Sequence, residues 1–182
     1  MTYDIALLPR HGDEDLAGAI ARLALDEDVE LDPALVAAWR DIEAHARKIV
    51  RGIRTTVIEP TCRELADDRT GITVNAEHYI TLSIPYWYDG EQRLEMLATL
   101  LQLAGQLEAD TGLAGHDLQV KRWLADGVTP AEAAAAYQHG RDTCAEPATT
   151  KHEDSGRLGH GIIRFFTWTM QERRRKRSPE EG

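Results

Sequence analysis

The chain has 182 residues, of which 42% are hydrophobic and 29% charged, and its formal net charge is −10. This composition suits one folded domain with an appended segment, and no run approaches the 18 apolar residues that a membrane-spanning helix needs. The negative charge argues against binding of nucleic acid or anionic lipid through the whole surface.

The cellular compartment follows from cysteine usage and from the N-terminus. Cys62 and Cys144 form no CxxC pair, which fits a reducing compartment better than a disulfide scaffold. The opening residues have neither a basic region nor a long apolar run, so we expect no signal peptide and a cytoplasmic protein.

The N-terminal third predicts one strand and two helices. Residues 3–8 (YDIALL) form a short apolar run before Pro9, which is typical of a buried strand. Asp13 is the predicted N-cap of a helix over 14–25. A capping Asp32 followed by proline predicts a second helix, which runs to about Gly52. The core stripe of that helix comprises Leu35, Trp39, Ile42, Ala46 and Ile49.

The middle of the chain predicts a hairpin and a long helix. Residues 59–71 contain Pro60 and Gly71 and are predicted to be a loop with at most one helical turn. Residues 72–74 and 79–87 are rich in β-branched and aromatic residues, with a turn over 75–77 between them. Asp89 and Gln92 predict a capping box for the following helix, which Gly112 ends.

The remaining elements complete an α+β domain over residues 1–142. Residues 113–120 predict a short strand, and Thr129, Pro130 and Glu132 predict the start of a helix that ends at Gly140. Residues 143–160 have linker composition, and 161–182 form a basic amphipathic segment. The order of elements predicts a small, mainly antiparallel sheet with helices packed on one face.

Four stretches carry a resemblance to a family: the opening MTYDIALLPR, the run ITLSIPYW, the amphipathic helix ending in TGL, and HDLQ at 116–119. Over residues 1–123 the chain resembles a loose group of small actinobacterial proteins that begin with Met-x-Tyr-Asp. Some members of that group resemble immunity proteins of polymorphic toxin systems. The group tends to place a Tyr-Asp-Pro-Gln segment after the helix, and here His116 and Leu118 replace its Tyr and Pro. The resemblance implies an α+β fold and a binding role, and it supplies no catalytic residue.

Motifs that carry enzyme chemistry are missing from the sequence. It contains no GxGxxG, no GxxxxGK[ST], no HExxH and no GxSxG, so we expect no cofactor and no enzyme. His116 and Asp117 are a base and a carboxylate, but neighbours on a strand point to opposite faces and would not pair.

Two stretches offer ligands of the kind that metals use. His139, Cys144, His152 and His160 are spaced more widely than zinc ligands, so no metal site is predicted. The carboxylates of the HGDED run (11–15) suit a divalent cation, or favourable charge at a helix N-terminus, which is the expected role.

A group of aromatic residues at the end of the predicted strand suits a protein interface. Tyr and Trp provide large contact area with a polar handle, and Trp87 alternatively belongs to the core with the tyrosines capping it. The candidate partner-binding residues are Tyr79, Tyr86, Trp87, Tyr88, His116 and Asp117.

The C-terminal segment contrasts in charge with the rest of the chain. Residues 157–177 carry seven cations and one acid, a net +6, whereas residues 1–156 carry −14. The candidate binding residues of this segment are Phe165, Phe166, Trp168, Arg173, Arg174, Arg175, Lys176 and Arg177. Three roles fit: docking on the domain or on a second copy in a homodimer, binding of nucleic acid, and binding of an anionic membrane. The sequence of this segment is compatible with both a helix and a strand.

These observations predict a non-enzymatic protein-interaction module. Its expected partner is a protein, such as a toxin or another basic protein, which the acidic surface would neutralise in the manner of an immunity protein. The alternative is an accessory protein that associates with nucleic acid or membrane through its basic C-terminal segment.

Overall fold

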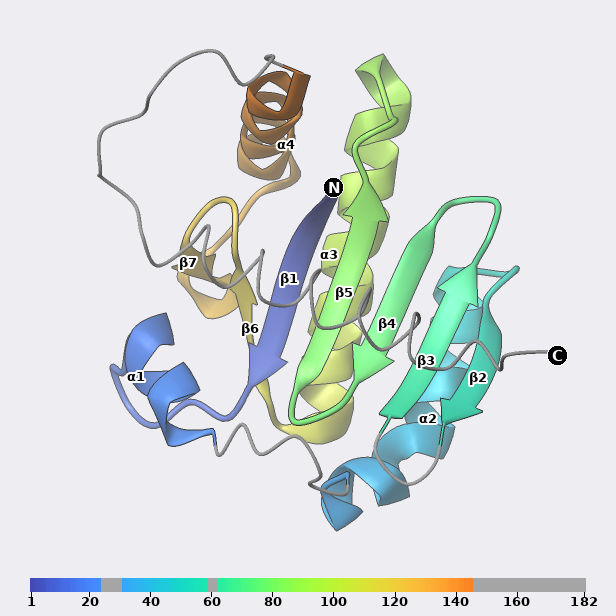
Figure 1. The fold of residues 1–182 in the computed structure, drawn as a ribbon, viewed down its shortest axis with the longest axis vertical. Helices are drawn as coiled ribbons and strands as arrows, with labels where there is room; N and C mark the ends of the chain where they lie inside the picture. Colours follow the sequence, from blue (N-terminus) through green and yellow to red (C-terminus); the bar gives the residue numbers. More distant parts are fainter. Residues whose placement is uncertain (24–30, 59–61, 146–182) are drawn as a thin grey trace, which may run out of the picture. The chain divides into compact units, whose positions relative to one another are not determined.

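The computed structural model of the chain describes residues 1–23, 31–58 and 62–145, which belong to one compact unit (Figure 1). Its sheet has seven described strands in the order β2-β3-β4-β5-β1-β6-β7, and every neighbouring pair is antiparallel. The strands are β1 (Thr2–Leu8), β2 (Arg54–Ile58), β3 (Cys62–Asp67), β4 (Ile72–Ala76), β5 (Ile80–Pro85), β6 (Ala114–Asp117) and β7 (Arg122–Trp123). The helices are α1 (Leu16–Arg22), α2 (Pro33–Ile49), α3 (Gly90–Thr111) and α4 (Pro130–Ala145), with a 3-10 turn at Leu124–Asp126. The predicted α+β class is confirmed.

The central strands β1 and β5 show how alternation in the sequence builds the core. Their register places Ile5 opposite Leu82 and Leu7 opposite Ile80, and all four side chains are fully buried. Because side chains alternate across a strand, these residues share one face of the sheet. That face packs against α2, α3 and α4 in a single hydrophobic core. The alternation of Ile80, Leu82 and Ile84 in the sequence thus matches the packing face of β5.

Local signals position the helices as the sequence indicates. Asp32 Oδ1 accepts the N–H of Ala34 at 2.8 Å, with Pro33 in the first turn of α2. The left-handed backbone of Gly112 (φ 71°) ends α3, as predicted. At the start of α4, Thr129 and Glu132 form the expected capping box, with the Thr129 N–H donating to the Glu132 carboxylate at 2.9 Å.

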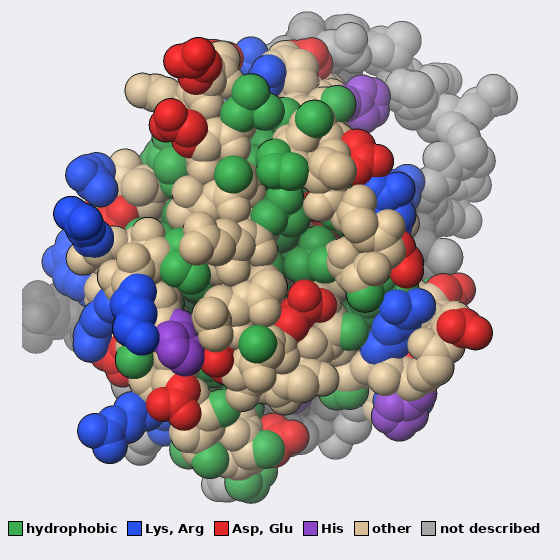
Figure 2. All heavy atoms as spheres, turned by 180° about the vertical axis from the view of Figure 1, so that it is seen from behind, with side chains coloured by type: hydrophobic (Ala, Val, Ile, Leu, Met, Phe, Trp, Pro, Cys, Tyr) green, Lys and Arg blue, Asp and Glu red, His purple; other side chains and the backbone are tan. Residues whose placement is uncertain are grey.

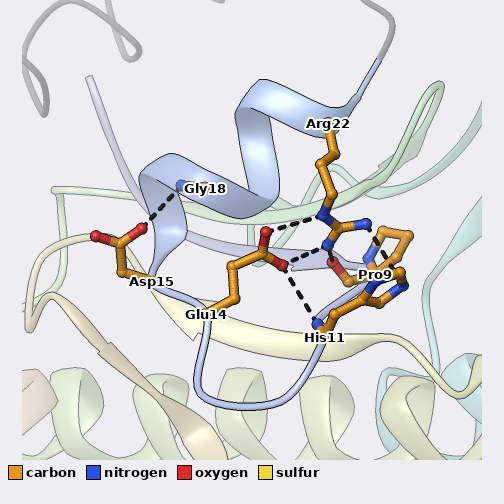
Figure 3. Close-up of polar contacts among 6 residues, drawn as sticks. All are labelled: Pro9, His11, Glu14, Asp15, Gly18 and Arg22. Atoms are coloured by element: carbon orange, nitrogen blue, oxygen red, sulfur yellow. Dashed lines mark hydrogen bonds and ion pairs between the residues drawn. The ribbon is translucent and has the colours of Figure 1, made fainter.

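The first helix lies on the other face of the sheet and begins two residues later than predicted. Asp15 rather than Asp13 caps α1, since its carboxylate accepts the Gly18 N–H at 2.8 Å (Figure 3). Ala19 of α1 joins a second hydrophobic cluster with Ala6 and Leu8, whose side chains point away from the main core. The helix therefore covers part of the face opposite to α2, α3 and α4.

The predicted loop over 59–71 is wrong, because β3 occupies Cys62–Asp67. Its sequence, CRELAD, has no β-branched residue, so strand propensity does not reveal it. The strand forms because β2 and β4 both pair with it, and only Leu65 and Asp67 of its side chains are buried. β2 was not predicted either, although its sequence RTTVI is rich in β-branched residues.

Helix α4 continues to Ala145 instead of ending at Gly140. Gly140 serves close packing, since a Cβ there would lie 2.5 Å from the Tyr86 hydroxyl. The capping box predicted for α3 does not form. Asp89 occupies the N-cap position, but its carboxylate makes no cap bond and pairs with Arg141 of α4.

Candidate functional site

The segment that connects β5 to α3, Pro85–Asp89, is held in place by helix α4. The Tyr137 hydroxyl donates to the Pro85 carbonyl at 2.6 Å and accepts the Tyr88 N–H at 2.9 Å. Arg141, one turn further along α4, donates to the Tyr88 carbonyl at 3.3 Å and pairs with the Asp89 carboxylate. Because three backbone groups of this segment have side-chain partners on one helix, its conformation is fixed by tertiary contacts.

The turn between β3 and β4 supports the same segment from another side. The Tyr88 hydroxyl donates to the Thr70 carbonyl at 2.7 Å. The buried Asp67 carboxylate in turn accepts the Thr70 hydroxyl at 2.6 Å and the Thr70 N–H at 3.2 Å. These bonds hold the carboxylate in its ionised form, and the pKa of Asp67 lies below its ordinary value even though burial opposes this shift.

Gly71 makes room for the ring of Trp87. Its backbone is left-handed (φ 63°), and a Cβ there would lie 2.7 Å from Cζ2 of Trp87 and 2.8 Å from Cγ of Pro85. Glycine therefore meets two requirements at this position, a backbone conformation unfavourable to other residues and close approach of the indole ring.

Trp87 is the side chain that this arrangement presents to solvent. It is 60% exposed, whereas its neighbours Tyr86 and Tyr88 are half-buried and pack against the main core. The Tyr86 ring meets that of Tyr137 edge-on, with centroids 4.8 Å apart. The alternative prediction, that Trp87 belongs to the core with the tyrosines capping it, is wrong, because Trp87 is exposed and Tyr86 and Tyr88 are the rings that pack against the core.

Tyr79 lies at the other end of the strand and does not belong to this site. It precedes β5, is half-buried and packs against the second hydrophobic cluster. The six residues of β5, roughly 20 Å of extended chain, lie between it and the segment that carries Trp87. The aromatic residues predicted as one set are thus split between two ends of the sheet.

Exposed carboxylates lie next to Trp87 along the chain. The Asp89 side chain is 75% exposed, and Glu91 and Glu95 are exposed on the first turns of α3. Figure 2 shows Asp and Glu side chains near the top of the helix-covered face, where α3 begins in Figure 1. We call Trp87, Asp89, Glu91 and Glu95 the Trp87 surface. It combines one large aromatic side chain with negative charge.

His116 and Asp117 are buried, so the partner-binding role predicted for them does not fit their positions. His116 is 5% exposed and Asp117 fully buried. As expected from strand geometry, they point to opposite faces. The His116 ring meets that of Trp123 edge-on at 5.0 Å, and the Asp117 carboxylate accepts the Tyr3 hydroxyl. Burial raises the pKa of Asp117 and lowers that of His116, with Arg10 contributing to the latter.

Two of the three HGDED carboxylates, those of Glu14 and Asp15, are engaged in local contacts. Glu14 binds the Arg22 guanidinium, with 2.8 Å between Oε1 and Nε, and accepts the N–H of His11 at 3.3 Å (Figure 3). The Arg22 contact lowers the pKa of Glu14. With Asp15 serving as the N-cap, these groups stabilise α1, in agreement with the expected role. No group of three or more potential metal ligands occurs among the described residues.

The remaining predicted sites are only partly within the described chain. His139 and Cys144 lie on α4, while His152 and His160 fall outside the described residues. All eight candidate residues of the C-terminal segment, from Phe165 to Arg177, also lie outside them. In the described part of the chain, no helix has the length and apolarity needed to cross a membrane.

Comparison of the chain with protein-family models, with curated proteins and with solved structures gives no match. The resemblance to the immunity-like group therefore stays a prediction. The candidate site is therefore defined by its geometry alone. Three of its residues, Gly71, Tyr137 and Arg141, were not predicted from the sequence.

Proposed function

We propose that the protein is a non-enzymatic interaction module that binds a basic protein partner through the Trp87 surface. The observation that carries this proposal is a 60%-exposed tryptophan on a segment clamped by Tyr137 and Tyr88, beside an Asp89 side chain that is 75% exposed. Tryptophan is among the residues that contribute most to binding energy at protein interfaces.

The clamped backbone favours binding because little conformational entropy would be lost on association. The segment is ordered by contacts inside the domain before a partner arrives, and preorganisation of this kind lowers the cost of binding. Its acidic neighbours would attract a basic partner and exclude an acidic one.

Neutralisation of a toxin-like partner, in the manner of an immunity protein, is the specific form of this proposal. It draws on the acidic surface and on the resemblance in residues 1–123.

The alternative function is association with nucleic acid or membrane through the basic C-terminal segment. The net +6 of residues 157–177 against the −14 of residues 1–156 is the observation that favours it. This binding would depend strongly on salt.

Affinity capture from lysate of the source cell, in parallel with and without nuclease treatment, separates the two functions. The full-length protein is compared with Asp89→Asn/Glu91→Gln/Glu95→Gln and with Arg174→Gln/Arg175→Gln/Lys176→Gln. Each variant removes three charges from the full chain. The proposal expects one protein to be captured stoichiometrically by the wild type and the C-terminal variant, and much less by the acidic variant. Loss of capture in the C-terminal variant alone would instead support the alternative.

A further inference from the structure

The negative charge of the chain is not spread evenly over the described domain. Residues 44–58 contain four cations and no Asp or Glu. Arg47 and Lys48 lie in the last turn of α2, Arg51 in the following connection and Arg54 at the start of β2, and all four are exposed. We call these four residues the α2–β2 basic surface.

Helix geometry directs the cations of α2 away from the rest of the domain. The buried stripe of α2 contains Leu35, Trp39, Ile42 and Ala46. At 100° per residue, Arg47 and Lys48 lie more than 90° away from the centre of that stripe. Figure 2 shows Lys and Arg side chains gathered along the left of the helix-covered face. Because this view is turned by 180°, its left side corresponds to the right side of Figure 1, where α2 and β2 lie.

The cations of this surface are available to a ligand. Arg47 pairs with Glu43, and Arg54 pairs with Asp68, in contacts whose cationic side chains are 54% and 74% exposed. Exposed pairs of this kind contribute about 0–1 kcal/mol each, so a phosphate can replace the carboxylate at low cost. Within the described chain, no ion pair engages Lys48 or Arg51.

The helix dipole accounts for only part of this arrangement. Cations in the last turn of a helix are favourable, which explains Arg47 and Lys48. Arg51 and Arg54 lie beyond the end of α2 and gain little from its dipole, because the effect falls off within the last turn. The helix dipole therefore does not account for the positive charge at these two positions.

The chemistry of the surface favours a nucleic acid over a protein. Protein interfaces centre on buried aromatic or apolar anchors. The large exposed hydrophobic side chains of the described chain are Met1, Val36, Trp87 and Leu94, and none lies within residues 44–55. Binding of a phosphate backbone needs only cations, and arginine suits it because its planar guanidinium can donate two parallel hydrogen bonds.

We infer that the α2–β2 basic surface binds the phosphate backbone of a nucleic acid without reading its base sequence. Glu43 and Asp68 are in direct contact with this surface, and a phosphate would have to replace them; acidic groups more than about 8 Å away are largely screened at physiological salt. The inference is independent of the proposed protein-binding function, because it involves none of the residues of the Trp87 surface.

Fluorescence anisotropy with a labelled DNA duplex of about 20 base pairs tests this inference in the full-length protein at about 50 mM salt. The test variant is Arg47→Gln/Lys48→Gln/Arg51→Gln/Arg54→Gln. The matched control, Arg174→Gln/Arg175→Gln/Lys176→Gln/Arg177→Gln, removes four cations from the C-terminal segment. We expect the test variant to lose at least about tenfold in affinity, and the slope of log K against log salt to become shallower by about 3.

Two further variants exclude an indirect effect on folding. Lys48→Gln/Arg51→Gln leaves both ion pairs intact and should still weaken binding. Arg47→Lys/Arg51→Lys/Arg54→Lys keeps the charges and should restore most of it. Unchanged affinity in the four-residue test variant would overturn the inference. So would displacement of the duplex by polyglutamate at equal charge, which would indicate an acidic polypeptide as the ligand.

Discussion

The hydroxyl of Tyr137 accepts the backbone N–H of Tyr88 at 2.9 Å, and this bond ties α4 to the segment that carries Trp87. The same hydroxyl donates to the Pro85 carbonyl at 2.6 Å. One side chain from a helix that begins 45 residues after Pro85 thus fixes the backbone on both sides of the exposed tryptophan.

Replacement of Tyr137 by Phe should destabilise the domain by about 1–3 kcal/mol. The ring can remain in the core, but the Tyr88 N–H and the Pro85 carbonyl each lose a partner, and leaving such groups unpaired has a cost of this size. Urea denaturation of wild type and variant measures the change. A variant as stable as the wild type would show that water replaces the hydroxyl at no cost.

Gly71→Ala should destabilise the domain more than Gly12→Ala does. Both glycines have a left-handed backbone (φ 63° and 60°), so both variants bear the same conformational penalty of about 1 kcal/mol. Only at position 71 does the new Cβ meet other atoms, lying 2.7 Å from Trp87, whereas nothing lies within 4 Å at position 12. We expect a further loss of about 1–3 kcal/mol at position 71 from overpacking.

Denaturation of the two glycine variants in parallel isolates the packing contribution. The fluorescence of the four tryptophans, compared between the variants, reports displacement of the Trp87 ring. Equal losses of stability in the two variants would contradict the contact between Gly71 and Trp87.

The buried Asp4 should make stability depend on pH. Asp4 is 7% exposed, accepts the Ser83 hydroxyl at 2.6 Å, and has a pKa raised above its ordinary 3.8, mainly by burial. The folded state therefore holds the Asp4 proton more tightly than the unfolded state does. Its contribution is fully present below pH 3.8 and is lost as pH rises through the raised pKa.

Comparison with Asp4→Asn isolates this contribution, because the variant retains all other titrating groups, including the buried Asp117. The free energy of unfolding of the wild type, minus that of the variant, should decrease as pH rises from acidic to neutral. A difference that does not change with pH would show that the Asp4 pKa is the same in both states.

Leu82→Ala should cost far more than Leu94→Ala. Leu82 is fully buried in the main core, where deletion of the side chain leaves a cavity and costs about 2–5 kcal/mol. Leu94 on α3 is 43% exposed, so the same change there should cost less than about 1 kcal/mol. Chemical denaturation of the two variants tests the burial of Leu82 and the exposure of Leu94, and similar losses would contradict that difference.

The parts of the fold that local signals determine were predictable. The alternation of Ile80, Leu82 and Ile84, the cap at Asp32 and the capping box at Thr129 each act within a few residues and appear in the structure. β3 was missed because its strand conformation depends on pairing with β2 and β4. The strand propensity of a segment does not indicate which other segments pair with it.

The candidate site was predictable only in part, for a related reason. The sequence places Tyr86, Trp87 and Tyr88 together, but distant residues decide which of them is exposed. Tyr137 packs against Tyr86, and Thr70 accepts the Tyr88 hydroxyl, which leaves Trp87 as the exposed ring. His116 and Asp117 looked available as polar residues near a strand end, yet both are buried in the completed sheet.

The most direct test of the central proposal is the dissociation constant of the captured protein partner for Trp87→Ala in the full-length chain. Val36→Ala is the control, since Val36 is also exposed (39%) but lies on α2. If the Trp87 surface binds the partner, Trp87→Ala should weaken binding by about 2 kcal/mol or more, roughly thirtyfold, with Val36→Ala unchanged. Equal affinity of the wild type and Trp87→Ala would contradict the proposal.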